Sequence, residues 1–326
     1  MSIILGIEST AHTFGIGIVE NGKILANVKD SYTTEKGGII PVESAKHHEK
    51  VAEDVLQNAI DNAGIKLKDI NAVAFSQGPG LAPCLKTGLE FAKKLSKELN
   101  VPLVPVNHCV AHLEIGRITG AKDPVMLYAS GANTQIIAYA GEKYRIFGET
   151  LDIGVGNFID TFARHAGMGF PGGHKISELA EKSKNYIELP YSIKGMDVSF
   201  SGMLTKLNQL FDKGEKVEDL SFSLQETAFA MLVESAERAM AHTNKKQLLL
   251  GGGVACNKRL QEMCRIMCKE RGAEFFCPEN SLLTDNGAMI AYLGEIMFNA
   301  GIKEKCADKV DFNPKQRTDD VEVKWR

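Results

Sequence analysis

No uninterrupted apolar segment in the chain approaches the roughly 20 residues that an α-helix needs to cross a bilayer. The N-terminus, Met1–Gly6, also lacks the basic segment and the small-residue cleavage site of a secretory signal peptide. Because both signals are missing, we expect no membrane partner. We further expect the protein to stay in the cytoplasm, where it is made.

A disulfide framework is also missing. The chain has 7 cysteines, an odd number, and they are scattered over 326 residues, whereas disulfide-stabilised proteins are usually short and rich in cysteine. Cys264 and Cys268 lie on a helical pattern, but the chain has no CxxC motif and no histidine near them. We therefore expect reduced thiols, with these two cysteines buried as apolar side chains.

An excess of basic charge is absent as well, because 38 Lys and Arg residues stand against 41 Asp and Glu, a net charge of −3. No overall positive field therefore indicates nucleic-acid binding, and a polyanion has to be held by a local patch or by a partner. The candidate phosphate contacts are a helical cluster, Lys93, Lys94 and Lys97, and a C-terminal group, Lys315, Arg317, Lys324 and Arg326.

What the chain does contain is a repeated α/β pattern. Its length suits two packed lobes. Three strand-like segments at 3–8, 14–20 and 24–29 open the chain, and three more lie at 125–129, 134–140 and 144–147. Further segments alternate between helix and strand: 43–63, 71–76, 87–99, 101–106, 156–166, 221–241 and 247–250. The pattern predicts two related α/β lobes with a cleft between them.

The expected boundary lies near Asp123-Pro124. We assign 1–122 to an N-terminal lobe that the C-terminal helix and tail, 284–326, complete, and 123–283 to a C-terminal lobe. The segment around 167–214 is rich in Gly, Ser, Lys and Tyr. We predict that it is irregular, and such a segment inside a packed lobe usually lines a site or forms a lid.

Three turns follow buried strands, at 8–10, 130–133 and 251–253. Backbone amides in such turns can hold phosphate oxygens, especially at a helix N-terminus. A single turn of this kind is more often a plain connection. Three of them at matching strand ends of duplicated lobes predict a nucleotide in the cleft.

His108 and His112 are four residues apart at the start of a predicted helix. Residues at this spacing share one helical face, about 5–6 Å apart, so both imidazoles can reach one divalent ion. A pair of surface or capping histidines gives the same spacing. Asp285 is a candidate third ligand, because a carboxylate beside two imidazoles suits iron, zinc, manganese or magnesium. Alternatively, Thr284 or Asp285 caps the helix that follows.

Asp160 is a second carboxylate of interest, because apolar residues flank it in the helical run 158–162. A carboxylate that faces inward needs a partner, and a ribose hydroxyl or a cation would serve.

The chain resembles the universal family that synthesises threonylcarbamoyladenosine in tRNA, formerly labelled O-sialoglycoprotein endopeptidases. The segments that carry the resemblance are 4–10, 76–80, 86–89, 102–113, 128–134, 199–202, 251–257 and 316–319. They span essentially the whole chain. Tyr128 and the segment 43–48 resemble the archaeal and eukaryotic branch, whose member is the catalytic subunit of the KEOPS complex.

The resemblance implies the actin/Hsp70/sugar-kinase (ASKHA) fold and an acyltransferase activity. The implied reaction moves a threonylcarbamoyl group from threonylcarbamoyl-AMP to N6 of the adenosine 3′ to the anticodon, in tRNAs that read codons starting with A, and releases AMP. It also implies one divalent metal ion, iron or zinc before magnesium or manganese. The implied partners are tRNA, ATP or AMP, and other KEOPS subunits, among them an atypical small protein kinase and a dimerising subunit.

Carried over by position, the resemblance makes His108, His112 and Asp285 metal ligands and Tyr128 a fourth contact. The implied nucleotide contacts are Tyr128, Ala129, Ser130, Gly131, Ala132, Asp160, Gly173 and Asn257. Ser177 stands where relatives have an acid that holds the ribose, and Ala132 stands in place of a common glycine.

The residues leave the proton acceptor and two other activities open. Glu8 and His47 are candidate acceptors, although a buried hydrogen-bonding carboxylate and a helix-surface histidine explain them equally well. A zinc metallopeptidase of the zincin type needs Glu directly after the first histidine, but this chain has Cys109. A sugar kinase or chaperone-like ATPase would use the same cleft and leave the histidine pair without a role. A scaffold for a kinase partner is a weaker alternative.

Overall fold

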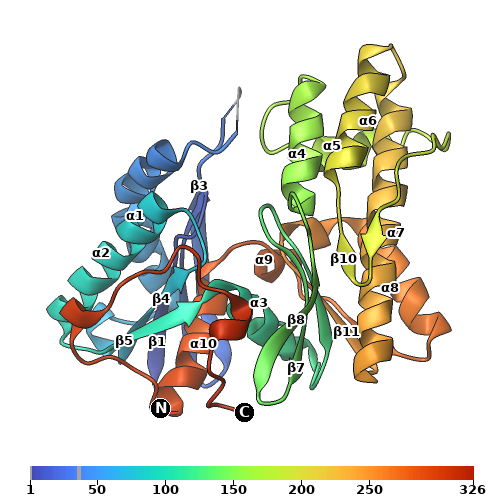
Figure 1. The fold of residues 1–326 in the computed structure, drawn as a ribbon. Coiled ribbons are helices and arrows are strands. Elements are labelled where there is room, and N and C mark those ends of the chain that lie inside the picture. The colour runs from blue at the N-terminus through green and yellow to red at the C-terminus, as the bar shows by residue number, and fades with distance from the viewer. Residues whose placement is uncertain (1, 35–37) are drawn as a thin grey trace.

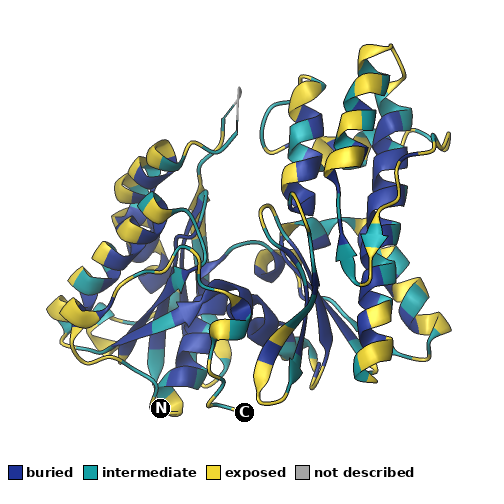
Figure 2. Ribbon diagram, viewed as in Figure 1, coloured by how far each residue is buried: buried dark blue, intermediate teal, exposed yellow. Residues whose placement is uncertain are grey.

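The computed structural model describes residues 2–34 and 38–326. Two α/β lobes lie side by side, each built on a five-stranded mixed sheet (Figure 1). Strands and the helix faces that cover them are buried, whereas the outer faces of the helices are exposed (Figure 2). Among the described residues, no helix combines the length and the apolar character that a membrane span requires.

The N-terminal sheet has the strand order β3-β2-β1-β4-β5. Its strands are β1 (Ile3–Glu8), β2 (Thr13–Glu20), β3 (Lys23–Ser31), β4 (Ala72–Gly78) and β5 (Leu103–Asn107). Helices α1 (Pro41–Ala63) and α2 (Ala82–Leu99) cover one face, and α3 (His108–Gly116) and α10 (Gly287–Asn299) cover the other. Both α1 and α2 begin earlier than the sequence pattern predicts, because each carries a proline in its first turn, where proline is favoured.

The C-terminal sheet has the order β12-β11-β6-β7-β8. Its strands are β6 (Val125–Ala129), β7 (Thr134–Ala140), β8 (Lys143–Glu149), β11 (Gln247–Gly251) and β12 (Glu274–Phe276). The helices of this lobe are α4 (Val155–His165), α5 (Gly173–Ala180), α6 (Ser201–Asp212), α7 (Val217–Thr243), α8 (Lys258–Glu270) and α9 (Asn280–Leu283).

The two sheets repeat one topology. In each, an antiparallel three-strand meander is extended by two parallel strands: β4 and β5 beside β1, and β11 and β12 beside β6. The predicted duplication of architecture is therefore confirmed. The assignment of residues 1–122, 123–283 and 284–326 to the two lobes remains a prediction.

The prediction of an irregular segment around 167–214 is wrong for much of its length. It contains α5, α6 and a short hairpin of β9 (Ile193–Lys194) and β10 (Asp197–Val198). Helix α5 has only eight residues and starts at Gly173, so its apolar period is too short to detect. Buried Phe200 and Met203 of this segment join the core of the C-terminal lobe, and packing, more than local propensity, explains its helices.

Helix α10 lies directly on the N-terminal sheet because two glycines allow close approach. A Cβ on Gly6 would lie 2.2 Å from the backbone nitrogen of Ala291, and one on Gly17 would lie 2.2 Å from that of Ala288. Since real Cβ atoms cannot approach so closely, α10 can lie this near the sheet only with glycine at both positions. Asp285 stands just before this helix.

Helix α3 lies between the two lobes (Figure 1). One buried cluster joins its side chains, such as Val110 and Leu113, to Val104 of the N-terminal sheet and to Met126 and Leu249 of the C-terminal sheet. Every residue of α3 is buried, as expected for a helix that is covered on all sides. The helix that carries the histidine pair is therefore part of the core between the lobes.

Candidate metal centre

The local sequence explains how α3 presents its histidines. Strand β5 ends at Asn107, whose side chain accepts a hydrogen bond from the backbone N–H of Val110 at 3.0 Å and caps the helix. His108 follows directly as the first helical residue, and His112 lies one turn later. Their rings are 4.8 Å apart between centroids, so the spacing does place both imidazoles on one face.

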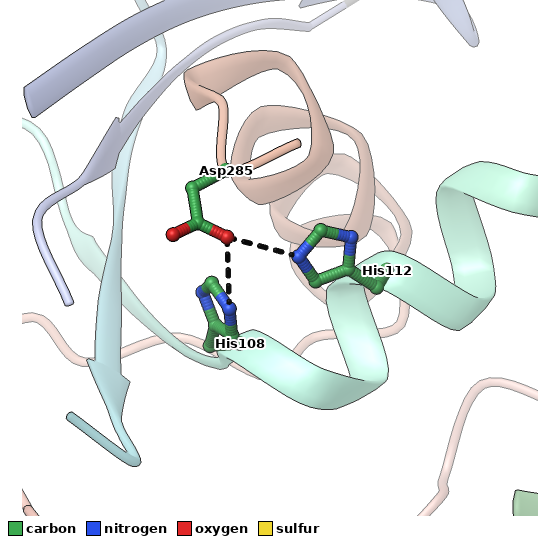
Figure 3. Close-up of side chains that lie close together, drawn as sticks. All are labelled: His108, His112 and Asp285. Carbon is green, nitrogen blue, oxygen red and sulfur yellow. Dashed lines mark hydrogen bonds and ion pairs between the residues drawn. The ribbon is translucent and has the colours of Figure 1, made fainter. Parts of the chain in front are cut away.

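Both imidazoles point at the carboxylate of Asp285 (Figure 3). Oδ1 of Asp285 lies 3.5 Å from Nε2 of His108 and 3.4 Å from Nε2 of His112. The hydroxyl of Tyr128 lies 3.1 Å from Nε2 of His108. The side chains of the two histidines are 5% and 1% exposed, and that of Asp285 is 19% exposed. The structure therefore brings together all four residues expected around a metal ion.

The donor set fits a metal ion in chemistry and spacing. One ligand atom from each of His108, His112 and Asp285 lies within 4.8 Å of the other two. Donors about 2.0–2.2 Å from a tetrahedral ion are separated by about 3.3–3.5 Å, which matches the distances from Asp285 to the two imidazoles. Among the described residues, this is the one such group of His, Cys, Asp and Glu side chains.

Glu8 contacts Nδ1, the ring nitrogen of His108 that does not face Asp285. Its Oε2 lies 2.9 Å from Nδ1 of His108, and its Oε1 accepts from the backbone N–H of Thr10 at 2.7 Å. Because a carboxylate only accepts, Nδ1 carries the proton and Nε2 remains directed at Asp285. A carboxylate that binds the remote nitrogen of a histidine is the usual support of a metal-binding imidazole. Glu8 is fully buried.

The electrostatics are those of a site that attracts a cation. Burial disfavours a charged imidazole, but Glu8 and Asp285 outweigh it and raise the pKa of His108 to about 9. Burial lowers the pKa of His112. Burial also opposes ionisation of Asp285, yet the charge of His108 and the hydrogen bond from His112 hold its pKa well below the usual value. A proton on His108 therefore occupies the place of a cation, and the two compete.

The expectation that Thr284 or Asp285 caps the next helix is wrong. The cap of α10 is Asn286, whose side chain accepts from the backbone N–H of Met289 at 2.9 Å. This leaves the carboxylate of Asp285 to face the histidines. Lys29 supports the same loop, because its ammonium group donates to the backbone oxygen of Asp285 at 3.1 Å and to the hydroxyl of Thr284.

The candidate nucleotide loop of the C-terminal lobe packs against α4. The carbonyl of Ser130 accepts from the backbone N–H of Gly156 at 3.0 Å, and that of Gly131 accepts from Asn157 at 2.9 Å. Gly252 has a φ of +89°, and a Cβ there would lie 2.4 Å from the carbonyl oxygen of Ala129. Two of the three predicted turns therefore meet at the carboxyl ends of β6 and β11.

Asp160 has a protein partner. Its Oδ1 accepts from the backbone N–H of Gly172 at 2.8 Å, and burial raises its pKa. Gly173, which follows Gly172, begins α5, and a Cβ there would meet no other atom within 4 Å. The space next to Gly173 is therefore open to a ligand, whereas one oxygen of Asp160 is already engaged.

Ser177 and Asn257 lie together. The side-chain amide of Asn257 donates to Oγ of Ser177 at 3.3 Å and to Oε1 of Gln225 at 2.5 Å, while its oxygen caps α8 by accepting from Arg259. Gln225 is a partner that the sequence pattern does not single out. No local signal marks it, because polar Ser223, Glu226 and Thr227 lie around it on α7.

The two candidate proton acceptors differ in place. Glu8 belongs to the metal group, as described above. His47 lies on α1, where its Nε2 is 2.9 Å from Oδ1 of Asp30, and it is not part of the group around Asp285. The structure therefore brings one of the two candidates to the metal centre.

A pocket of about 470 Å³ lies between the lobes, at the insertion. Its lining residues are Thr33, Thr34, Gly167, Met168, Gly169, Phe170 and Lys175. Thr34 of the N-terminal lobe forms a β-bridge with Phe170. The pocket shares no residue with the metal group. The predicted role of the insertion in lining a functional site stays a prediction.

The candidate tRNA contacts lie mostly in ion pairs. Those formed by exposed side chains are Lys94 with Glu53, Lys97 with Asp308, Arg317 with Asp319, and Lys324 with Glu322. Exposed pairs are weak, so these cations can exchange an acid for a phosphate, and their role stays a prediction. The side chain of Arg326 is only 12% exposed, which argues against a phosphate contact there.

Cys109, Cys264 and Cys268 do not belong to the metal group. Cys264 and Cys268 are buried in the core of the C-terminal lobe, as expected. Burial raises the pKa of Cys109 to about 12, so its thiol is neutral at physiological pH and a poor nucleophile.

Comparison with known proteins identifies relatives along the whole chain. A family model described as tRNA N6-adenosine threonylcarbamoyltransferase matches residues 23–292. A protein of that name from Thermococcus kodakarensis is 55% identical over 324 residues, which cover 99% of either chain. One from Archaeoglobus fulgidus is 51% identical with the same coverage. A Methanosarcina mazei protein named probable bifunctional tRNA threonylcarbamoyladenosine biosynthesis protein is 52% identical, and the match covers 60% of its length.

Solved structures share the fold at low identity. The crystal structure of T. kodakarensis HypF matches 92% of this chain and 48% of its own, with a TM-score of 0.67 and 14% identity. The activator of 2-hydroxyisocaproyl-CoA dehydratase from Clostridium difficile, with bound ADPNP, matches 93% and 98%, with a TM-score of 0.55 and 12% identity. These likenesses confirm the expected two-lobed ASKHA fold.

Proposed function

The chain belongs to the tRNA N6-adenosine threonylcarbamoyltransferase family and is a transferase, and we propose that it uses a divalent metal ion held by His108, His112 and Asp285. The observation that carries the proposal is the convergence of both Nε2 atoms on Oδ1 of Asp285, at 3.5 and 3.4 Å, in a buried site. The proposed donor of the threonylcarbamoyl group is threonylcarbamoyl-AMP, and the acceptor is N6 of the adenosine 3′ to the anticodon.

Two nitrogen donors and one carboxylate favour iron or zinc over the harder magnesium and manganese ions. The hydroxyl of Tyr128 is the proposed fourth contact. Burial raises the pKa of Tyr128 well above its usual value, so the phenol keeps its proton unless a cation lies next to it. Glu8 fixes the tautomer of His108 in either case.

The proposed reaction has a simple balance. N6 attacks the carbamoyl carbon, the bond from that carbon to the phosphate oxygen breaks, AMP leaves, and one proton of N6 is released. A bound divalent ion supplies Lewis-acid stabilisation of the negative charge on the departing phosphate. The lone pair of N6 is delocalised into the purine, so we expect positioning of the two substrates to contribute much of the rate.

We propose that the adenylate extends from the metal centre into the C-terminal lobe. The loop of Ser130, Gly131 and Ala132 lies at the carboxyl end of β6, next to Tyr128. The open space at Gly173 and the amide of Asn257 beside Ser177 are the proposed contacts to the nucleoside. Asp160 offers its second oxygen. We propose that the hydroxyl of Ser177 and the amide of Asn257 contact the ribose.

We propose different roles for Glu8 and His47. Glu8 is committed to hydrogen bonds with His108 and Thr10, so we propose that it orients the metal ligand. His47 remains a candidate proton acceptor, together with solvent. The comparisons support the transferase and give no support to an ATPase or a metallopeptidase, and the neutral thiol of Cys109 cannot replace the glutamate of a zincin.

We further propose that tRNA is gripped largely by partner subunits of a KEOPS-type assembly, among them a small kinase and a dimerising subunit, because the net charge of −3 gives the chain no overall positive field. The Methanosarcina relative is named as bifunctional, which supports a functional association with a second activity. We expect the protein to act in the cytoplasm.

The test is transfer by purified protein supplied with threonylcarbamoyl-AMP, substrate tRNA and its partner subunits, read as modified adenosine by mass spectrometry. His108→Ala should abolish transfer and leave the fold intact. A matched control is His165→Ala, which removes a histidine on α4 that is 34% exposed and paired with Asp212. Equal product from His108→Ala and the control would refute the assignment.

A further inference from the structure

The last residues of the chain run along the helix that carries the histidine pair. We call residues 313–326 the C-terminal tail. The tail starts against the N-terminal lobe, where the backbone N–H of Asn313 donates to the carbonyl of Gln77 at 2.8 Å and that of Gly80 donates to the carbonyl of Pro314 at 3.2 Å. It ends near the junction of the two lobes (Figure 1).

The tail contacts the N-terminal end of α3. Oε1 of Gln316 accepts from the side-chain amide of Asn107 at 3.1 Å, and the amide of Gln316 donates to Gln77 at 3.2 Å. Asn107 is the N-cap of α3 and immediately precedes His108. Gln316 of the tail therefore holds the N-cap residue of α3, the helix that carries the two histidines.

The tail also holds the other end of α3 through Glu114, which is fully buried. Its carboxylate accepts from Nε1 of Trp325 at 2.9 Å, from the hydroxyl of Tyr144, and from Arg117 at 2.9 Å. The guanidinium group of Arg326 lies 3.8 Å from it. A buried carboxylate needs such partners, and two of these four residues end the chain.

The same tail is fastened to the C-terminal lobe. Thr318 donates to Oε1 of Gln135 at 3.3 Å, and Arg317 lies 3.5 Å from Glu149. The guanidinium group of Arg326 lies over the rings of Tyr139 and Tyr144, at 4.6 and 5.3 Å from their centroids. The tail therefore connects both ends of α3 to both lobes.

The position of Glu114 gives these contacts a consequence for the metal centre. Residues two apart on an α-helix point about 200° apart, so Glu114 anchors the side of α3 opposite to His112. Helix α3 has nine residues, too few to be stable on its own, and packing sets its rotation. Ligands must be held within about 0.5 Å to bind a metal well. An anchor behind α3 is suited to that task.

We propose that the C-terminal tail is a brace for α3, meaning that its contacts hold this helix in one rotation. We further propose that Glu114 is a positioning residue of the metal centre. The inference rests on the proposed function, because it assigns the metal to His108, His112 and Asp285. Loss of the brace lets α3 rotate and separates the imidazoles from Asp285. By linkage, a metal ion that holds α3 also holds the tail.

The chain provides its own reporter, because Trp325 is its one tryptophan. Zinc has no absorption that quenches indole emission, so titration of metal-free protein with Zn²⁺ should change the emission of Trp325 only if the ion orders the tail. We expect a saturable change with one Zn²⁺ per chain. We expect His108→Ala to show no change.

The variants are Glu114→Gln, which keeps the shape and removes the charge, and Trp325→Phe, which removes the indole N–H at a partly exposed position. Glu322→Gln is the matched control, because it changes an exposed tail residue paired with Lys324. The readouts are Zn²⁺ affinity by chelator competition, the visible spectrum of bound Co²⁺, and the melting temperature without metal. The first two variants should lose at least about tenfold in affinity and shift the Co²⁺ bands, and the control should match the unaltered chain.

Two outcomes overturn the inference: unchanged Zn²⁺ affinity and Co²⁺ spectrum in both variants, even with a lower melting temperature, or Trp325 emission that ignores saturating Zn²⁺. Failure of the proposed function looks different, because His108→Ala would then bind Zn²⁺ as tightly as the unaltered chain. Trp325→Phe keeps the experiment decisive if Glu114→Gln does not fold.

Discussion

Replacing Glu8 with glutamine separates the two roles that a buried carboxylate beside a metal ligand can have. Glu8→Gln preserves the shape of the side chain and removes its charge. In the native protein, Oε2 of Glu8 lies 2.9 Å from Nδ1 of His108, with neither group more than 5% exposed. If Glu8 orients His108, the change acts through metal binding. If Glu8 accepts the proton from N6, the change acts on the chemical step.

The structure gives the size of the expected effect. A hydrogen bond to a charged group contributes about 1.5–3 kcal/mol, which corresponds to a factor of about 10 to 150 in affinity. Removal of a carboxylate that supports a metal-binding histidine typically weakens metal binding about 10–100-fold. The two estimates agree, so we expect Glu8→Gln to bind Zn²⁺ one to two orders of magnitude more weakly. The amide of glutamine also allows His108 to flip its ring.

The assay is transfer measured across a series of metal concentrations. A positioning role predicts that excess Zn²⁺ or Fe²⁺ restores most of the transfer by Glu8→Gln. A deficit that persists when a chelator-competition titration shows the site to be saturated would refute the positioning role and assign proton transfer to Glu8. Unchanged metal affinity in Glu8→Gln would refute the hydrogen bond as a support of the centre.

Three other predictions follow from particular contacts. Burial lowers the pKa of His48 to about 4 from 6.5, so the unfolded chain binds a proton that the folded chain excludes. The free energy of unfolding should therefore fall by up to about 3 kcal/mol as pH drops from 6.5 to 4. In urea unfolding, the free energy of unfolding of His48→Gln should depend less on pH than that of the unaltered chain. An equal dependence on pH contradicts the assignment. Asn257→Asp keeps the oxygen that caps α8 but loses the donor to Ser177 and Gln225, so AMP affinity by calorimetry should fall about tenfold; unchanged affinity removes this residue from the site. Cys109 should resist iodoacetamide at pH 8 in the folded protein while exposed Cys306 is labelled; rapid labelling of Cys109, seen by peptide mass spectrometry, would contradict its burial.

Much of the fold is visible in the sequence because its strands and turns are local signals. The first hairpin carries Asn21-Gly22, both with positive φ as that turn requires, and β1 alternates between two buried clusters, with Ile4 in one and Leu5 in the other. The repeated meander then predicts the duplicated lobes. Helix α5 was missed because eight residues carry too little period to recognise.

The grouping of the proposed metal ligands was predictable in part. The spacing of His108 and His112 is a local signal, and the structure places both on one helical face. The proposed third ligand, Asp285, lies 173 residues from His112, and nothing local shows that it meets the two histidines. The competing interpretation of Asp285 as a helix cap failed because Asn286, one residue later, takes that position.

The supports of the site were not predictable from local pattern. Glu114 reads as one acidic residue at a helix end, yet it accepts from Trp325 across 211 residues of sequence. Gln225 reads as a polar residue of a long helix, yet it meets Asn257. Partners of this kind are chosen by tertiary packing, which brings distant residues into a low-dielectric site where each polar group needs a match.

The most direct test of the central claim is an anomalous difference map of the crystallised protein, with data collected on both sides of the zinc and iron absorption edges. We predict one strong peak per chain among Nε2 of His108, Nε2 of His112 and Oδ1 of Asp285, and no peak there in crystals of His108→Ala. A peak at another place, or none at these three atoms in protein that transfers the threonylcarbamoyl group, would contradict this prediction.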